Sequence, residues 1–347
     1  GRGASAFTLL VKKYEEAVDW YNKAIKLNAN SPEAHNNLGV ALKNLNRFEE
    51  AVISYNKAVE LKPDYFTSFN NLGVALKRVK RYQEAVIAYN KAVELKPDYA
   101  EAHNNIGDAL NSLGNYAEAI LSFKKAIDLE NCLPETHNNL GVAYRNLRQY
   151  NNAVSSYKTA IKLQPAYAEA YNNLGNALTE LNRQHEAATQ LSKAIEIKPD
   201  FVEAYFNLGA AYEGMGDFQA AISQHERSLR INPKFSEALN NCGLMLMALC
   251  DMPGAMKYFN SALQLGSKFS LTSFYYNKGL LFQQLGDLDD ALVCYKKGYM
   301  ELPHKPEKQS NARVFALCPF GRSGSLFFHS LFDGHPEFLV NAIHFQI

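Results

Sequence analysis

A glycine recurs along this chain at a fixed interval of 34 residues, and this interval constrains the fold more than any single motif does. The series consists of Gly39, Gly73, Gly107, Gly141, Gly175, Gly209, Gly243 and, after a step of 36 residues, Gly279. An alanine stands 12 residues beyond each glycine, and a proline stands 24 residues beyond most of them. Periods of about 20 to 50 residues are typical of stacked-repeat proteins. The sequence therefore predicts a solenoid over most of the chain.

Each repeat contains two apolar faces with helical spacing. Eight full repeats begin at Pro32, Phe66, Ala100, Pro134, Ala168, Val202, Ser236 and Thr272, so that the glycine occupies position 8 of each. Positions 4, 7, 8 and 11 share one face of a first helix, and positions 20, 24 and 27 form a stripe on a second helix. Glycine at position 8 and alanine at position 20 let the two helices approach closely beside an aromatic residue at position 24. The pattern predicts a helix, a short turn and a second helix in every repeat.

Proline and acidic residues mark the expected helix ends. The proline at position 32 lacks an N–H group and ends the second helix. Asp98 with Glu101, and Asp200 with Glu203, have the spacing of caps for the helix that follows.

The small residues at positions 8, 20 and 27 and the proline at position 32 resemble the tetratricopeptide repeat (TPR) family. This resemblance implies an all-α, superhelical solenoid of antiparallel helix pairs. We expect a partial repeat in residues 1–31, where Tyr14 to Leu27 carry only the second-helix pattern, and eight repeats in residues 32–305. The departures are local, since Ser228 replaces the alanine at position 27 and Asn131 replaces the proline.

Composition excludes several classes of function. The chain has 36 Lys+Arg against 35 Asp+Glu and no basic block, which predicts no nucleic-acid partner. Its five cysteines form no Cys-x-x-Cys pair, and Cys242 takes a position that leucine holds elsewhere, which predicts no metal site and a reducing, cytoplasmic location. No apolar run approaches the roughly 18 residues of a membrane span. His35, His103 and His137 share position 4 with aromatic residues of other repeats, and we predict that they pack there.

Asparagines line the face of the first helix opposite to its core stripe. Position 6 carries Asn37, Asn71, Asn105, Asn139, Asn173, Asn207, Asn241 and Asn277, and position 5 carries Asn36, Asn70, Asn104, Asn138, Asn172 and Asn240. Asparagine in a helix interior is about 0.5 kcal/mol less favourable than alanine, so a compensating role is expected. Recent duplication is one explanation, although position 9 has diverged between repeats. A local role, in which the amides tie adjacent helices together, is a second.

The third explanation is a row of carboxamides that binds a peptide. Each carboxamide donates and accepts hydrogen bonds, so a row of them is suited to the main chain of an extended peptide. The array of O-GlcNAc transferase is similar, with asparagine at the same position along its groove. Our hypothesis is that five of them grip a partner's main chain: Asn71, Asn105, Asn139, Asn173 and Asn207. The array needs no cofactor for this role, and its partners are protein or peptide segments.

The last part of the chain departs from the repeat. Residues 306–312 are polar and are predicted to be a linker. Arg313 to Cys318 is an apolar run of strand type, Pro319 to Ser325 is a Gly/Ser turn, and Leu326 to Phe332 has a helical pattern. A strand that leads through such a turn into a helix is typical of phosphate sites, because loop N–H groups and the helix N-terminus face the anion.

This short segment resembles the 5′-phosphosulfate loop of sulfotransferases, whose donor is 3′-phosphoadenosine 5′-phosphosulfate (PAPS). The resemblance implies that Arg322, Ser323, Gly324 and Ser325 surround the phosphosulfate. The resemblance covers only about residues 313–340, and we interpret residues 313–347 as the truncated start of such a domain.

The segment has no obvious catalytic residue. Val340 to Ile343 offers no carboxylate base where the tyrosyl branch has one, and His329 and His335 are interpreted as packing and turn residues. We therefore expect this chain to be inactive alone, and to continue at both ends in a longer protein.

Three functions follow from the sequence. The first is a scaffold that binds extended peptides in the asparagine-lined groove, as the partner- or acceptor-recruiting arm of a larger enzyme. The second is a sulfotransferase that acts on a protein or glycan hydroxyl. The third is the arm of an O-GlcNAc-type glycosyltransferase, against which the Gly321 to Ser325 loop argues.

Overall fold

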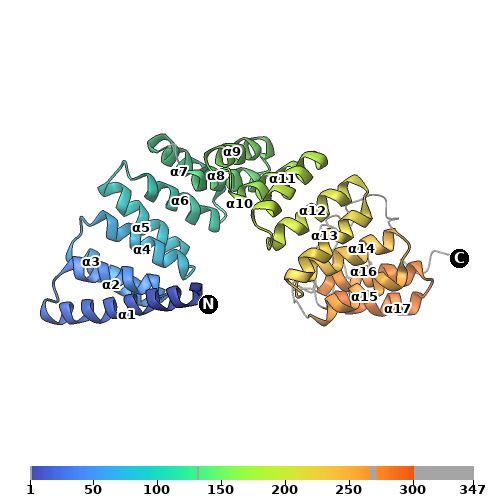
Figure 1. Cartoon of the computed structure of the whole chain (residues 1–347), viewed down its shortest axis with the longest axis horizontal. Helices are drawn as coiled ribbons and strands as arrows, with labels where there is room; N and C mark the ends of the chain where they lie inside the picture. The colour runs from blue at the N-terminus through green and yellow to red at the C-terminus, as the bar shows by residue number, and fades with distance from the viewer. Residues whose placement is uncertain (1, 131–132, 266–270, 301–347) are drawn as a thin grey trace, which may run out of the picture. The chain divides into compact units, whose positions relative to one another are not determined.

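The computed structural model describes residues 2–130, 133–265 and 271–300. These residues form seventeen α-helices and contain no strand. The chain divides into two units, Gly1–Leu181 and Asn182–Ile347, and Figure 1 labels the helices of both. The all-α solenoid predicted from the 34-residue period is confirmed. The predicted strand, loop and helix of the last segment lie outside the described residues.

Unit 1 is a stack of ten helices in which each helix packs against the next one along the chain. They are α1 (Arg2–Leu27), α2 (Pro32–Asn44), α3 (Phe48–Leu61), α4 (Phe66–Arg78), α5 (Tyr82–Leu95), α6 (Ala100–Ser112), α7 (Tyr116–Leu129), α8 (Pro134–Asn146), α9 (Tyr150–Leu163) and α10 (Ala168–Glu180). The first helices α2, α4, α6, α8 and α10 also contact one another in succession. An apolar core runs continuously from Val18 of α1 to Ala143 of α8.

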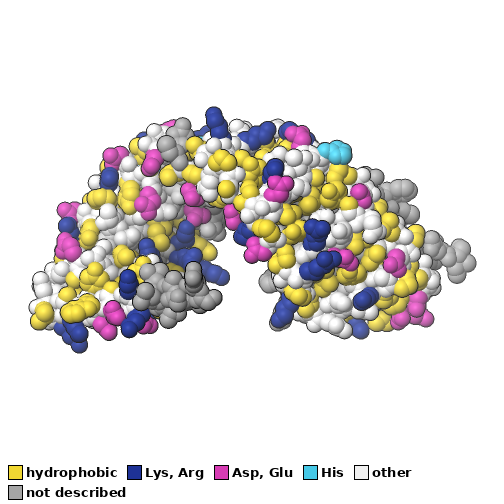
Figure 2. All heavy atoms as spheres, viewed as in Figure 1, with side chains coloured by type: hydrophobic (Ala, Val, Ile, Leu, Met, Phe, Trp, Pro, Cys, Tyr) yellow, Lys and Arg dark blue, Asp and Glu magenta, His cyan; other side chains and the backbone are white. Residues whose placement is uncertain are grey.

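The described part of unit 2 continues the same arrangement with seven helices. They are α11 (Gln184–Ile197), α12 (Val202–Met215), α13 (Phe218–Ile231), α14 (Ser236–Ala248), α15 (Met252–Gln264), α16 (Leu271–Gln284) and α17 (Leu288–Met300). Each of them again packs against its successor. On the face drawn in Figure 2, acidic and basic side chains are interspersed over both units without a continuous block of one sign.

Residues 2–27 form one continuous helix. α1 is 26 residues long, and Tyr14 to Leu27, which carry the second-helix pattern, make up its C-terminal half. Val18 is buried, and Tyr21 and Ile25 pack against the same core. The helix that carries the second-helix pattern thus continues upstream to Arg2 without a turn.

A close contact joins the position-8 glycine to the ring at position 24 in seven of the eight repeats, the exception being the fifth, which has Leu191 there. A Cβ atom added to Gly73 would lie 2.5 Å from Cε1 of Tyr89, and one added to Gly107 would lie 2.7 Å from Cε1 of Phe123. Both rings are completely buried. Because no side chain fits between helix and ring, glycine at position 8 sets the distance between the two helices of a repeat.

The turn between the two helices of a repeat depends on a left-handed residue at position 15. Its occupants with φ between 57° and 62° are Asn46, Lys80, Arg148, Asn182 and Cys250, and the other repeats have Gly114, Gly216 and Gly286 there. The next residue closes the turn, as where the Arg81 N–H donates to the carbonyl oxygen of Leu76 at 2.9 Å. The sequence pattern did not reveal this conformation, since only three repeats carry glycine at that position.

The predicted caps at Asp98 and Asp200 are wrong. α6 begins after Tyr99 and α12 begins after Phe201, and neither residue makes a side-chain capping bond. The aromatic residue occupies the cap position because its ring packs at the repeat junction, where Tyr99 lies edge-on to Phe66 with 5.5 Å between ring centroids. Side-chain caps are found instead at Ser31, Asp217 and Asp251.

Replacing Gly73 with alanine tests the glycine–ring contact. We expect Gly73→Ala to lower the free energy of unfolding by about 1 to 3 kcal/mol, because the new methyl group overlaps the buried ring of Tyr89. Intrinsic helix propensity acts in the opposite direction, since alanine is favoured over glycine by about 1 kcal/mol. Urea unfolding followed by circular dichroism measures the difference. An increase in stability would show that propensity, and not the contact, dominates at this position.

His225 replaces the aromatic ring in the sixth repeat and makes stability depend on pH. Its ring is fully buried against Gly209, and neither ring nitrogen has a hydrogen-bond partner among the described residues. Burial lowers the pKa of His225 from 6.5 to about 4. Between these values the unfolded chain binds a proton that the folded chain excludes, so the stability present above pH 6.5 is lost as the pH falls toward 4.

His225→Phe is expected to remove this part of the acid sensitivity. Phenylalanine already fills the same position as Phe123 and Phe259, so the variant is expected to fold. Relative to the variant, the wild type should lose up to about 1.4 kcal/mol per pH unit in this window. Unfolding curves of both proteins from pH 7.5 to 4.5 give the comparison. Parallel curves would contradict a buried neutral histidine.

Candidate functional site

The asparagines of neighbouring repeats are hydrogen-bonded to one another. The amide nitrogen at position 6 of one repeat donates to the amide oxygen at position 5 of the preceding repeat. The donor–acceptor pairs are Asn71–Asn36 at 3.2 Å, Asn105–Asn70 at 3.0 Å, Asn173–Asn138 at 3.0 Å and, in unit 2, Asn277–Asn240 at 2.8 Å. The local role considered from the sequence is therefore present in the structure.

The two asparagine positions differ in exposure. Asn36, Asn70, Asn138 and Asn172 at position 5 are buried, with Asn70 only 2% exposed. The side chains at position 6 are half-buried, apart from Asn37, which is exposed. Position 5 thus belongs to the packing between repeats, whereas position 6 lies at the surface of the first helices.

Asn70 connects two repeats through both ends of its side chain. Its amide nitrogen donates to the hydroxyl of Tyr99 and to Oε1 of Glu101, each at 3.2 Å, and its oxygen accepts the bond from Asn105. Burial, with the nearby charge of Glu101, raises the pKa of the Tyr99 hydroxyl to about 12. The hydroxyl therefore stays protonated at neutral pH.

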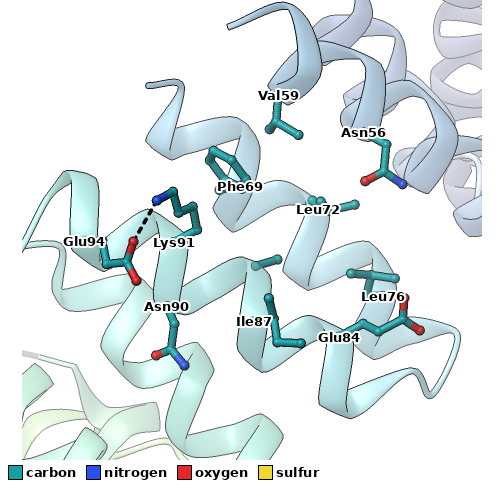
Figure 3. A pocket seen from close by; sticks show the side chains of 11 residues that line it. Asn56, Val59, Phe69, Leu72, Leu76, Glu84, Ile87, Asn90, Lys91 and Glu94 are labelled. Carbon is teal, nitrogen blue, oxygen red and sulfur yellow. Dashed lines mark hydrogen bonds and ion pairs between the residues drawn. The ribbon is translucent and has the colours of Figure 1, made fainter. Parts of the chain in front are cut away.

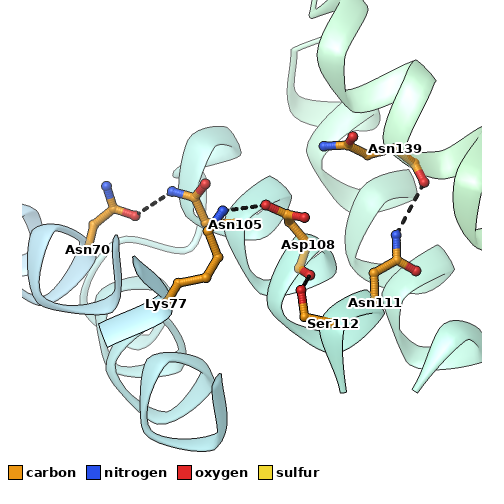
Figure 4. A network of polar contacts seen from close by, with 7 residues as sticks. All are labelled: Asn70, Lys77, Asn105, Asp108, Asn111, Ser112 and Asn139. Carbon is orange, nitrogen blue, oxygen red and sulfur yellow. Dashed lines mark hydrogen bonds and ion pairs between the residues drawn. The ribbon is translucent and has the colours of Figure 1, made fainter. Parts of the chain in front are cut away.

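Further polar contacts hold the first helices of unit 1 together (Figure 4). Lys77 of α4 forms an ion pair with Asp108 of α6. Asn111 of α6 donates to the backbone oxygen of Asn139 in α8 at 3.4 Å. Sequence reasoning missed these contacts, because their partners stand 28 and 31 residues apart in sequence and belong to different repeats.

In three of the position-6 amides of unit 1, only the nitrogen has a hydrogen bond among the described residues; Asn37 differs, because its oxygen accepts from Asn36 at 3.3 Å. Asn71, Asn105 and Asn173 donate through Nδ2, and no hydrogen bond to their Oδ1 atoms is found among the described residues. Each nitrogen also keeps a second proton. The inter-repeat bond fixes the orientation of the amide and leaves an acceptor and a donor at the surface.

The other predicted asparagines are less uniform. Asn104 is half-buried, and its Oδ1 atom has no hydrogen-bond partner among the described residues, while Asn139 supplies the backbone oxygen described above. In unit 2, Asn241 follows a repeat that has Phe206 and not asparagine at position 5, and Phe206 packs against His225 and Phe235. The row is therefore most regular in unit 1.

The histidines at position 4 pack as predicted. Nε2 of His35 lies 3.0 Å from the backbone oxygen of Ala29, and Nε2 of His103 lies 3.0 Å from that of Pro97. His137 is buried. Among the described residues, no group of three or more His, Cys, Asp or Glu side chains has the arrangement of a metal site.

Cys242 is a core residue, as its place in the repeat predicted. Its side chain is completely buried, and burial raises the pKa of the thiol to about 12. The predicted phosphosulfate residues Arg322, Ser323, Gly324 and Ser325, together with His329 and His335, lie outside the described residues. No described helix is long and apolar enough to cross a membrane.

Two solved TPR structures resemble the chain over about half of its length. The crystal structure of MamA is 32% identical, with a TM-score of 0.44, and the match covers 48% of this chain and 96% of MamA. YrrB, described as a TPR protein with an unusual peptide-binding site, is 25% identical with a TM-score of 0.45, covering 53% of this chain and 95% of YrrB. No curated protein sequence matches the chain.

Family models match most of the repeat region. Those described as TPR repeat cover residues 12–46, 143–182 and 175–216, and those described as tetratricopeptide repeat cover 32–65, 64–129, 202–235 and 272–300. Together these matches span more than half of the chain, and they agree with the helix pairs and the glycine–ring contacts described above. The chain belongs to the tetratricopeptide repeat family.

Proposed function

We propose that this protein binds an extended peptide segment along the position-6 asparagines of unit 1, as the partner-recruiting arm of a larger assembly. The residues that carry the proposal are Asn71, Asn105, Asn139 and Asn173. The peptide contributes main-chain N–H and C=O groups, and the amides of the protein accept from and donate to them. Asn207 is a corresponding position-6 residue of unit 2 and is proposed to bind a peptide main chain there in the same way.

The supporting observation is that three of these amides form a hydrogen bond through the nitrogen only. Asn71, Asn105 and Asn173 are each oriented by a bond to the preceding repeat, while the Oδ1 atom carries no bond within the described residues. A polar group that is oriented before binding loses less conformational entropy when its ligand arrives. A row of such groups is suited to a peptide main chain.

The charges around the row favour a neutral ligand group. Lys77 is neutralised by Asp108, and Glu101 is engaged by Asn70 and Tyr99. Lys77 and Asp108 thus compensate each other, whereas Glu101 keeps its negative charge and is held in place by two neutral donors. The exposed amides are left as the principal hydrogen-bonding groups, and an amide recognises peptide groups without regard to side-chain sequence.

The test separates peptide binding from the local role of the asparagines. An array of unrelated 15-residue peptides identifies a binder, and fluorescence anisotropy then measures its Kd for three proteins. We expect the triple variant Asn71→Ala, Asn105→Ala, Asn139→Ala to bind at least tenfold more weakly, because main-chain hydrogen bonds of about 0.5 to 1.5 kcal/mol each are lost.

The matched control is Asn70→Ala, which removes the inter-repeat acceptor of Asn105 but leaves the exposed amide in place. It is expected to lower stability through the unpaired groups of its partners and to change Kd less than the triple variant does. Circular dichroism checks that helicity is retained in both. Equal losses of affinity in the two variants would assign the asparagines to the stack alone.

A second function has support only in the sequence of the last segment. The loop Gly321 to Ser325, between a strand-type run and a helical pattern, favours a 5′-phosphosulfate site and hence a sulfotransferase. In this reading Arg322 neutralises the anion. Thermal unfolding with adenosine 3′,5′-bisphosphate is the test. A rise in Tm that disappears in Arg322→Ala would support this function. We expect no rise for this chain, because residues 313–347 are interpreted as only the start of such a domain.

A further inference from the structure

A cavity lies on the outward side of α4, away from its asparagines. It has a volume of about 580 Å³ and lies between α3 and α5, with Phe69, Leu72 and Leu76 of α4 as its floor (Figure 3). Ile87 of α5 lines one wall and Val59 of α3 the other. Its polar residues stand on α3 and α5, and the Lys91–Glu94 ion pair at 2.8 Å leaves the rim without net charge there. The cavity is thus suited to aliphatic side chains.

Three aliphatic side chains stand exposed on the second helices α3, α5 and α7, and the middle one, Ile87, lines this cavity. They share position 22 of consecutive repeats, and their exposed fractions are 70% for Ile53, 67% for Ile87 and 67% for Leu121. The fold does not require an apolar residue at this position, because the next four repeats have Ser155, Thr189, Ser223 and Lys257 there. An exposed aliphatic row confined to three neighbouring repeats is typical of an interaction surface.

The charges beside this row are arranged so that the face complements itself. Along α5 the outward residues are Arg81, Glu84, Ile87, Lys91 and Glu94. If a second copy of α5 lies antiparallel to the first, each of these charged side chains faces a side chain of opposite charge on the other copy. Two copies of α5 that run antiparallel, with Ile87 against Ile87, therefore set Glu84 against Lys91 and Arg81 against Glu94.

The flanking helices have the same order of charges. The outward residues of α3 are Arg47, Glu50, Ile53, Lys57 and Glu60, and those of α7 are Glu118, Leu121, Lys125 and Asp128. When α5 meets α5 across a twofold axis, α3 of one copy meets α7 of the other. Glu50 then faces Lys125, and Lys57 faces Glu118. Ion pairs within single helices, such as Lys57–Glu60 at 2.8 Å, leave these side chains exposed and able to join such networks.

We propose that this face is a homodimer interface that binds a second copy of the chain. It consists of the outward residues of α3, α5 and α7 named above. The aliphatic rows meet at the twofold axis, and the cavity beside Ile87 receives aliphatic atoms of the other copy. The asparagines on the first helices are outside this contact. Because only three aliphatic side chains per copy are at its centre, the dimer is weak, with a Kd of about 1 to 100 μM.

The test is the concentration dependence of mass for the whole chain, measured by sedimentation velocity from 1 to 200 μM. The wild type is expected to pass from monomer to dimer in this range. Ile53→Ser with Ile87→Ser is expected to weaken the dimer at least tenfold, and it introduces the residue already present at Ser155 and Ser223. Val293→Ser, at the same repeat position in α17 and 46% exposed, is the matched control and should leave the dimer unchanged.

An exchange of charges within α5 tests the antiparallel geometry. Glu84→Lys is expected to weaken the dimer, because it sets two lysines against each other. The double variant Glu84→Lys, Lys91→Glu is expected to restore it, since the reversed order of charges remains self-complementary. A monomer at every concentration would overturn the proposal, and so would a dimer insensitive to the isoleucine changes. Failure of the double variant to restore a dimer weakened by Glu84→Lys would overturn the α5–α5 contact.

Discussion

The contact between a glycine and a buried ring sets the distance between the two helices in seven of the eight repeats; the fifth repeat has Leu191 in place of the ring. The glycine at position 8 leaves no space for a Cβ atom, since the ring at position 24 would lie about 2.4 to 2.9 Å from it in seven of the repeats. Because both residues recur with the repeat, the same contact forms in seven repeats, and within each unit consecutive helices pack against one another in order. The regular stack, and the row of first helices with it, depends on this contact.

A regular stack brings side chains of different repeats into register, and this gives the asparagines two roles. An amide at position 6 reaches the amide at position 5 of the preceding repeat only because successive first helices contact each other with a constant offset. The bond compensates for the low helix propensity of asparagine and orients the outer half of the amide. The position-6 asparagines can therefore stabilise the stack and at the same time offer hydrogen-bonding groups to a ligand.

The two faces of unit 1 offer different chemistry to partners. The first helices present amides, and Lys77 and Asp108 beside them compensate each other. The second helices present aliphatic side chains between charges of alternating sign, around Ile87. The first helices are therefore suited to a peptide main chain, and the second helices are suited to an apolar surface with alternating charges. Substitutions on one helix of a repeat can be made without changing the side chains of the other face.

The sequence alone determined the repeat length, the helix pairs and the side of each helix that faces the core. It did so because a 34-residue period and a 3.6-residue helical period are both visible in one chain. It did not determine the caps, since the rings of Tyr99 and Phe201 compete with Asp98 and Asp200 for the helix start. It also missed the left-handed residue at Lys80. Only the tertiary structure decided which amides are engaged and which aliphatic side chains stay exposed, because those contacts join neighbouring repeats.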